Sequence, residues 1–200
     1  IKISKNANRM RNMISELLEF RKLEQNYVSL HVCEQNLIPF LKDIYLSYCE
    51  LAAQQSITFD FHHAEENLLL WFDSNQLQKV FYNLLSNAFK YTKQGGAIEL
   101  HVSSDGNEVR IKVIDTGIGL SPDDVSHIFD RFYQAENGKQ VAGANPGTGL
   151  GLALSKNIIY LHHGDIAVQS QVGYGTIFTV TLLTVSYTHL RAHETSQDIV

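Results

Sequence analysis

Two asparagines one helical turn apart are the residues of this chain best suited to chemistry. Asn83 and Asn87 lie four positions apart in QLQKVFYNLLSNAFKYT, so a helix would present both on one face. Amide oxygens suit a hard Mg²⁺ ion, which also binds the oxygens of a triphosphate. Lys90 follows close to the same face, where an ammonium can meet phosphate oxygens, and Tyr91 would flank it. The spacing predicts the phosphate end of a nucleotide site, although helix-borne amides can equally cap a loop and the lysine can simply be solvated.

A carboxylate at the end of a predicted strand supplies the other end of such a site. Asp115 closes the apolar run 109–114 and begins the segment Asp-Thr-Gly-Ile-Gly. A lone carboxylate in this position can accept a hydrogen bond from an exocyclic amine such as that of adenine. Gly117 and Gly119 would let the backbone approach a flat base closely.

A second glycine run, Gly147-Thr-Gly-Leu-Gly151, precedes a predicted helix. The first amides of a helix have no partner within it and can bind phosphate, to which Thr148 could add a hydroxyl. A dinucleotide-binding GxGxxG is the alternative. It fits poorly, because position 152 is leucine and no strand enters directly from Pro146.

Five motifs in fixed order carry a family resemblance. NLLSNAFKY, DTGIG, FDRFYQ, GTGLGLAL and GYGTIFTV resemble the N, G1, F, G2 and G3 boxes of the histidine-kinase catalytic domain. This domain belongs to the ATP-binding superfamily of gyrase, Hsp90 and MutL, and the resemblance covers residues 28–183. A single glycine pair would be weak evidence, whereas five ordered motifs in compatible strand and helix context are specific.

The resemblance implies a fold and a set of ligands. The fold is the Bergerat type, an α+β two-layer sandwich with a mixed sheet against about three helices. ATP and Mg²⁺ are the implied cofactors, with Asn87 as the metal ligand, Asn83 and Lys90 near the phosphates, and Asp115 on the adenine amine. The full set carried over is Asn83, Asn87, Lys90, Tyr91, Asp115, Gly117, Gly119, Gly147, Thr148, Gly149, Leu150, Gly151 and Thr176.

Some motif residues have an ordinary structural explanation of nearly equal weight. Phe129 and Phe132 match the F box, but aromatic residues at helical spacing are more often core anchors than ligand contacts. A Gly-Tyr-Gly turn explains Gly173 and Gly175 almost as well as a role at the adenine end. We expect Trp71 and its neighbour Phe72 to serve packing.

The residue at position 83 favours a kinase over an ATPase. Superfamily members that hydrolyse ATP carry a glutamate there, which acts as general base for water. An amide cannot deprotonate water, whereas a neutral imidazole needs little activation as an acceptor. The resemblance therefore implies transfer of the γ-phosphate to a histidine and then to a response-regulator aspartate. The alternative is an inactive ATP-binding or interaction module; the glutamate-dependent ATPases and the anti-sigma serine kinases fit less well.

The accepting histidine itself is expected to lie outside this chain. Relatives place it in a motif like His-Glu/Asp-hydrophobic-Arg/Lys-x-Pro, and none of the nine histidines has such neighbours. We expect the acceptor upstream of Ile1 in the intact protein. This chain should bind ATP without phosphorylating itself.

Residues 1–25 read as an amphipathic helix. Apolar side chains recur at alternating spacings of four and three, which is typical of a helix that packs on a partner helix. By resemblance it is the second helix of the dimerisation and phosphoacceptor hairpin, so the intact protein should be a homodimer. The apolar positions are Ile3, Ala7, Met10, Ile14 and Leu17. An ordinary helix folded on its own domain is the alternative.

Between residues 28 and 183 the pattern alternates between strand and helix periods. Asp73 and Ser121-Pro122 are predicted helix starts, Asp105-Gly106 a hairpin turn, and residues 130–147 a mobile lid. The predicted strands are 28–32, 57–61, 68–71, 98–102, 109–114, 166–168 and 176–183, and the predicted helices are 37–53, 73–91, a short one after 121, and 150–161.

Composition excludes several classes. With a net charge of −5 and no basic stripe, nucleic-acid binding by this domain is not expected. The two cysteines form no CxxC or Cys/His pattern, and adjacent histidines on a strand face opposite ways, which argues against a zinc site. No apolar run is long enough to cross a bilayer, so we expect a cytoplasmic domain, whose parent the resemblance makes an inner-membrane sensor. Residues 184–200 have neither the periodicity of a strand or helix nor any likeness to a receiver domain, and they are expected to be disordered or non-native.

Overall fold

The computed structural model describes residues 30–135 and 147–184 of the chain. It also describes seven positions before them, all helical and exposed: Met10, Arg11, Ile14, Ser15, Leu17, Leu18 and Arg21. The proposed lid interior at 136–146 and the tail at 185–200 lie outside the described residues, as does most of the segment 1–25.

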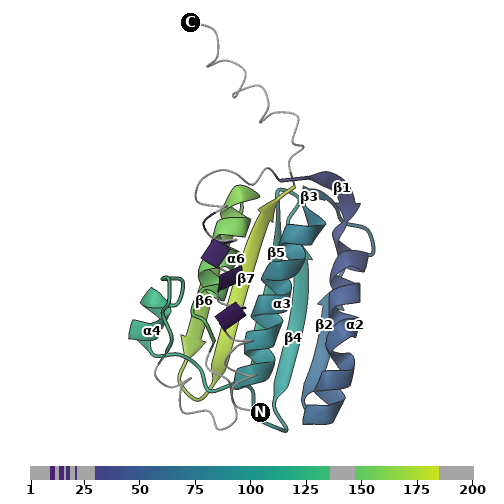
Figure 1. Ribbon diagram of the computed structural model, residues 1–200. Helices are drawn as coiled ribbons and strands as arrows, with labels where there is room; N and C mark the ends of the chain where they lie inside the picture. The colour runs from purple at the N-terminus through teal and green to yellow at the C-terminus, as the bar shows by residue number, and fades with distance from the viewer. Residues whose placement is uncertain are drawn as a thin grey trace, which may run out of the picture.

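A five-stranded mixed sheet forms the centre of the domain (Figure 1). Its strand order is β2-β4-β5-β7-β6, and only the β2–β4 pair is parallel. A separate small sheet pairs β1 with β3 in antiparallel register. The strands are β1 (Cys33–Asn36), β2 (Thr58–His63), β3 (Leu69–Phe72), β4 (Ala97–Ser104), β5 (Glu108–Asp115), β6 (Asp165–Gln171) and β7 (Gly175–Leu183).

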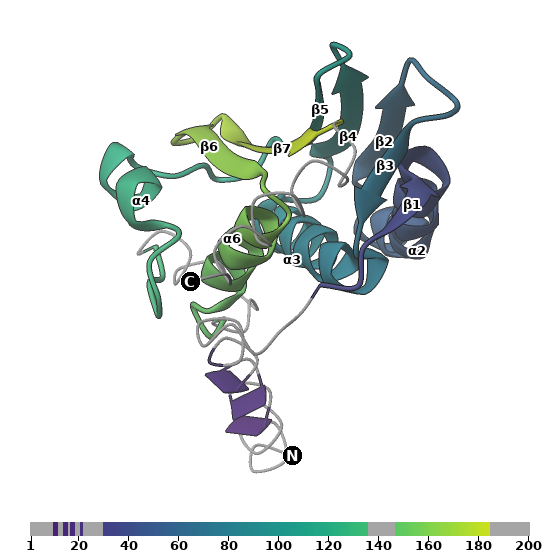
Figure 2. The ribbon, with the colours of Figure 1, turned by 90° about the horizontal axis from the view of Figure 1, so that it is seen from above.

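Three helices cover one face of the five-stranded sheet, and a short one lies beside its β6 edge (Figure 2). No described helix covers the opposite face. The long helices are α2 (Leu37–Gln55), α3 (Ser74–Tyr91) and α6 (Gly151–Leu161), and the short one is α4 (Pro122–His127). The expected two-layer sandwich of a mixed sheet and about three helices is confirmed.

Helix α3 carries the N-box asparagines, and its sequence fixes where it begins. The Asp73 side chain accepts a hydrogen bond from the Gln76 amide at 3.1 Å, which caps the first turn as predicted. A buried stripe then follows at spacings of three and four and packs into the core. This stripe consists of Leu77, Val80, Phe81, Leu84, Leu85, Ala88 and Phe89. The helix thereby turns its opposite, more polar side away from the core.

The first strand is the clearest error of the sequence prediction. A strand was expected at 28–32, but residues 30–32 have no regular structure and β1 begins at Cys33. Pairing with β3 sets the position of β1, because Cys33 pairs with Phe72 and Asn36 pairs with Leu69. The polar residues of β1 give no alternation from which such pairing can be read.

Other expectations hold with small shifts of the boundaries. Helix α2 continues to Gln55, and α4 has the predicted Ser121 cap. The Asp124 carboxylate reinforces this cap by accepting a hydrogen bond from the Ser121 amide. Phe72 is fully buried as expected, whereas Trp71 is 41% exposed, so the packing role assigned to Trp71 is wrong. Strand alternation explains the difference, since adjacent residues of β3 face opposite sides.

His162, the first of two adjacent histidines after α6, has a structural role. The His162 ring accepts a hydrogen bond from the Asp73 amide at 3.1 Å, and its other nitrogen donates to the Ile158 carbonyl at 2.7 Å. Burial lowers the pKa of His162. The ring is therefore neutral at pH 7 and ties the end of α6 to the start of α3.

None of the helices in the described parts of the chain combines the length and the apolar character needed to cross a bilayer.

Candidate nucleotide site

Asn83 joins α3 to the first turn of α6. Its amide nitrogen donates to the Ser155 hydroxyl at 3.0 Å, and that hydroxyl donates to the Gly151 carbonyl at 2.9 Å. A Cβ added to Gly151 would lie 2.4 Å from the Asn83 side-chain oxygen, so only glycine allows this approach. Asn83 therefore positions the start of α6, a contact that sequence reasoning did not foresee.

The next residues on the same face of α3 keep their polar groups available. Asn87 is half-buried, and its carboxamide has no hydrogen-bond partner within residues 30–135 and 147–184. The Lys90 ammonium lies 4.7 Å above the Tyr91 ring and 3.9 Å from the position of a Cβ on Gly147. The predicted N-box and G2-box residues thus meet in space.

The amino end of α6 is open toward this face. The helix begins at Gly151 with buried Leu150 as its cap residue, and no side chain of the described residues caps its first amides. The Thr148 hydroxyl accepts a hydrogen bond from the Leu150 amide at 3.2 Å, which shapes the turn into the helix. Uncapped amides and the helix dipole together favour an anion at this point.

The F-box segment is attached to the same glycine loop. The Phe132 amide donates to the Gly149 carbonyl at 2.9 Å, and the Gln134 side chain donates to the Gly147 carbonyl at 2.8 Å. Phe129 packs on the core as expected, but Phe132 is 55% exposed, so a core role for Phe132 is wrong. Phe132 has a positive φ of 61°, which is uncommon for a residue other than glycine.

Asp115 occupies the other end of the site, where β5 stops. It is 7% exposed and pairs across the sheet with buried Thr176. Its carboxylate accepts a hydrogen bond from the Gly117 amide at 2.8 Å. Burial raises the pKa of Asp115 to about 6, although the amides of Gly117 and Thr176 act in the opposite direction. The carboxylate is therefore still ionised above neutral pH and can accept a further donor.

Contacts of the backbone close this end tightly. A Cβ on Gly175 would lie 1.8 Å from the Asp115 carbonyl oxygen, and the φ of Gly175 is 115°. Gly119 sits against Gln171 at the end of β6, and the Ile118 amide donates to the Tyr91 carbonyl at 3.3 Å. The G1 and G3 motifs thereby join β5, β6, β7 and the end of α3.

Thr92 is a polar residue at this end that the sequence analysis missed. Its hydroxyl is buried and has no hydrogen-bond partner among the residues that the structure describes. The group follows directly on Tyr91, the last residue of α3. A buried hydroxyl without a partner costs about 1–3 kcal/mol, which a ligand or water could offset. The position of Thr92 directly after the N motif was the sequence feature that could have indicated a place in this site.

The donors and acceptors fit a Mg²⁺–nucleoside triphosphate. An amide oxygen on Asn87 suits the hard cation, while the Lys90 ammonium and the α6 amides suit phosphate. The buried carboxylate of Asp115 suits an amine at the base. The structure brings these groups together from α3, β5 and the start of α6.

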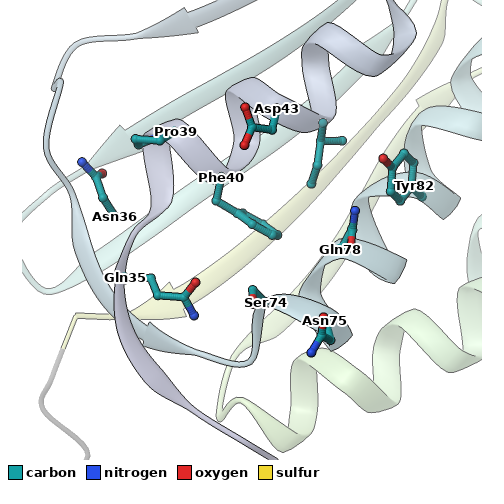
Figure 3. A pocket seen from close by; sticks show the side chains of 10 residues that line it. Gln35, Asn36, Pro39, Phe40, Asp43, Ser74, Asn75, Gln78 and Tyr82 are labelled. Atoms are coloured by element: carbon teal, nitrogen blue, oxygen red, sulfur yellow. The ribbon is translucent and has the colours of Figure 1, made fainter.

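A separate hollow lies on the other side of α3 (Figure 3). It has a volume of about 580 Å³ and is lined by β1, α2 and α3, including Phe40, Asp43, Gln78 and Tyr82. None of the predicted site residues lines it. Since Asn83 and Lys90 approach α6 and its glycine loop, the candidate nucleotide site lies on the α6 side.

Comparison with known proteins agrees with this geometry. The family model of the histidine kinase-, DNA gyrase B- and HSP90-like ATPases matches residues 72–185. Histidine kinase P4 of Formosa agariphila is 38% identical over 181 residues, which are 90% of this chain and 13% of that protein. This chain thus spans only a small part of that relative.

Solved structures show the same fold. The catalytic domain of histidine kinase ThkA is 25% identical with a TM-score of 0.69, covering 78% of this chain and all of that domain. Full-length ShkA in complex with AMPPNP is 23% identical with a TM-score of 0.79, covering 91% of this chain and 37% of ShkA. ThkA was also solved with the response regulator protein TrrA, at 22% identity and a TM-score of 0.74 over 92% of this chain and 49% of ThkA.

The fold and the site define a nucleotide-binding α/β domain with an N-box helix opposite a glycine-opened helix. The chain belongs to the histidine kinase-, DNA gyrase B- and HSP90-like ATPase family.

Proposed function

We propose that this chain is the ATP-binding catalytic part of a sensor histidine kinase. It would transfer the γ-phosphate of ATP to a histidine, from which the phosphate passes to an aspartate of a response regulator. The observation that carries the proposal is that the face of α3 with Asn83, Asn87 and Lys90 meets the start of α6, through Asn83 at Gly151 and Lys90 at Gly147, while Asp115 is buried at the end of β5.

Each residue of the site has a task in this proposal. Asp115 accepts a hydrogen bond from the adenine amine, with Gly117, Gly119 and Thr176 forming the walls beside it. Lys90 and the amides after Gly149 bind phosphate oxygens. Asn87 would hold Mg²⁺, which when bound neutralises part of the phosphate charge.

Asn83 determines which nucleophile this site can serve. Its amide is occupied by Ser155 and cannot act as a base toward water. Catalysis then rests on positioning and on charge stabilisation, and an imidazole can attack without a resident base. This supports a kinase rather than an ATPase.

The partners follow from the same proposal. Met10, Ile14 and Leu17 are helical and 67%, 55% and 39% exposed, which suits a helix that packs against a partner helix in a homodimer. ThkA was solved with a response regulator, and we propose such a partner here. The domain would act on the cytoplasmic side, where ATP is available, in a parent that is a membrane sensor.

Calorimetry with ATP tests the nucleotide site first. We expect micromolar to sub-millimolar binding that Mg²⁺ alters. Asp115→Asn should weaken it by about 10- to 150-fold, because hydrogen bonds to a charged group contribute about 1.5–3 kcal/mol. Asp43→Asn in the hollow beyond α3 is the matched control and should bind ATP normally. Unchanged affinity of Asp115→Asn would remove the basis of the proposal.

A phosphotransfer assay tests the reaction itself. The nine histidines lack the acceptor motif, so the assay supplies a dimerisation hairpin of a relative in trans. Radiolabel from ATP should appear on the hairpin histidine and not on this chain. ATP binding without any transfer to cognate hairpins would instead support an inactive binding module, and ATP turnover without an acceptor would support an ATPase.

A further inference from the structure

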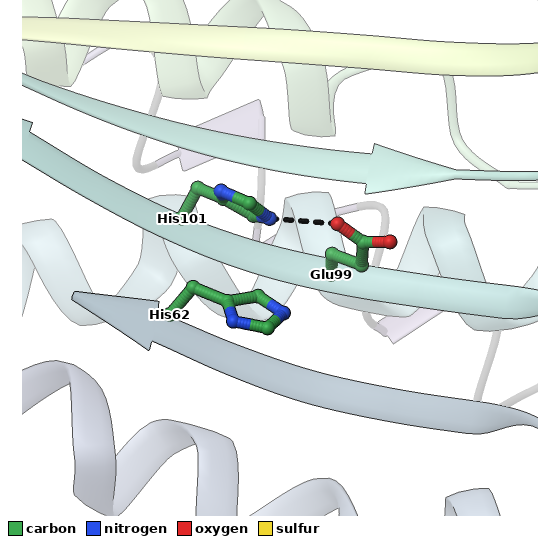
Figure 4. A group of neighbouring side chains, drawn as sticks. All are labelled: His62, Glu99 and His101. Atoms are coloured by element: carbon green, nitrogen blue, oxygen red, sulfur yellow. Dashed lines mark hydrogen bonds and ion pairs between the residues drawn. The ribbon is translucent and has the colours of Figure 1, made fainter.

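Three side chains that could hold a metal ion meet on the open face of the sheet, away from the nucleotide site (Figure 4). They come from two neighbouring strands. His62 of β2 pairs with His101 of β4 in parallel register, and Glu99 lies two residues before His101 on the same face. The pairing of β2 with β4 joins positions almost forty residues apart in the chain.

The ligand atoms of the three side chains all lie within 4.8 Å of one another. The His62 and His101 rings are 4.5 Å apart between centroids, and His101 Nε2 lies 2.6 Å from a carboxylate oxygen of Glu99. Figure 4 shows the three groups side by side, with His62 on the neighbouring strand below the hydrogen-bonded pair. Within the described parts of the chain, His62 has no hydrogen-bond partner of its own.

We propose that His62, Glu99 and His101 bind a divalent transition-metal ion of the Zn²⁺ type. Two imidazole nitrogens and one carboxylate oxygen are a ligand set that Zn²⁺ accepts, at about 2.0–2.2 Å from each. Tetrahedral bonds of this length separate ligand atoms by about 3.3 Å. Since the ligand atoms already lie within 4.8 Å of one another, side-chain rotations would suffice to reach this spacing.

Binding competes with a contact inside the cluster. His101 Nε2 and the Glu99 carboxylate lie 2.6 Å apart, and this contact must open to admit the ion. The metal needs neutral imidazoles and an ionised carboxylate, so the affinity should fall as the pH is lowered. Three protein ligands leave a fourth position for water or for a group of another molecule.

The neighbouring charges allow such an ion. Asp60 pairs with Glu99 in β2 and adds a second carboxylate to this face, whereas Lys112 pairs with His101 in β5 and opposes a cation. Lys112 is exposed and can turn into solvent. Because β2 is the edge strand of the sheet, the ion would cross-link this edge to β4.

Zinc calorimetry on the full chain without an affinity tag tests the proposal. An excess of Mg²⁺ is present to occupy the oxygen-rich nucleotide site, which a hard cation prefers. We expect one Zn²⁺ per chain, and His62→Gln and His101→Gln should each weaken binding by at least about tenfold. Zinc should raise the Tm of the wild type but not that of these variants.

His127→Gln is the matched control. His127 is an exposed histidine with a carboxylate partner, Asp130 at 2.8 Å, but within the described residues it belongs to no group of three possible metal ligands. This variant should bind Zn²⁺ like the wild type. Equal zinc affinity in His62→Gln, His101→Gln and wild type would overturn the site, and so would the absence of zinc binding by the wild type. A cobalt titration, followed by the visible absorption of tetrahedral Co²⁺, gives an independent readout on the wild type alone.

Discussion

The two ends of the nucleotide site are built in opposite ways. At the adenine end, strand ends and backbone contacts bury Asp115 and leave no space beside Gly175. At the phosphate end, Asn87 and Lys90 are only half-buried, and the first amides of α6 are uncapped. A flat, weakly polar base suits a rigid and dry wall, whereas a highly charged phosphate chain suits groups that stay solvated until it arrives.

The largest effect should come from the wall of the adenine end. Gly175→Ala places a methyl group against the Asp115 carbonyl at a φ of 115°, so the wall must move. We expect a loss of at least about 3 kcal/mol in the free energy of unfolding. Gly173→Ala, at φ 82° but with no atom within 4 Å, should cost only about 1 kcal/mol. Urea denaturation compares the two, and similar losses would show that the wall is not rigid.

Burial of Asp115 should make stability depend on pH. The pKa of this carboxyl rises from 3.8 to about 6 on folding, so the folded domain holds its proton more tightly than the unfolded chain. The resulting stabilisation is complete below the unfolded value and is lost as the pH rises through about 6. The gap between the two values corresponds to at most about 3 kcal/mol.

Urea titrations of wild type and Asp115→Asn between about pH 3.5 and about pH 7 measure this contribution, since other titrating groups cancel in the difference. Relative to the variant, the wild type should become less stable as the pH rises. A constant difference across this range would mean that Asp115 is well solvated, and the contrast between the two ends would then disappear.

The same substitution, asparagine to alanine, at two positions of α3 should distinguish a structural side chain from a ligand-binding one. Asn83→Ala removes the donor to the buried Ser155 hydroxyl and should cost about 1–2 kcal/mol of stability. Asn87→Ala breaks no bond to a described residue and should change stability by less than about 0.5 kcal/mol, but abolish the effect of Mg²⁺ on ATP binding. The helix-propensity change is common to both. Denaturation and calorimetry on each variant would decide, and reversed outcomes would exchange the two roles.

The smallest effect is expected at the solvated lysine. Lys90→Met should weaken ATP binding by about three- to tenfold at low salt and by less at high salt, because exposed charges are screened. Lys112→Met, on the open face of the sheet, is the control and should leave ATP binding unchanged. Salt-independent losses in Lys90→Met would point to packing on Tyr91 instead of attraction to phosphate.

Local signals made much of the fold predictable. The Asp73 cap, the Ser121-Pro122 helix start and the hairpin turn after β4 are each contained in a few consecutive residues. The boundaries of β1 were not predictable, because its polar residues are placed by pairing with β3. The motifs likewise supplied the candidate site residues. They did not indicate the bond of Asn83 to Ser155, or that the Thr92 hydroxyl has no partner among the described residues.

The sequence alone determined the family and most of the order of elements, and it proposed the residues of the two ends of the site, because helix periods, caps and motifs depend on short spacings. Only the tertiary structure decided what meets across the sheet and between helices. Helix packing brings Asn83 to Ser155. Strand register places Asp115 beside Thr176 and His62 beside His101. Such contacts join residues distant along the chain, and the energy that selects them is spread over the whole core.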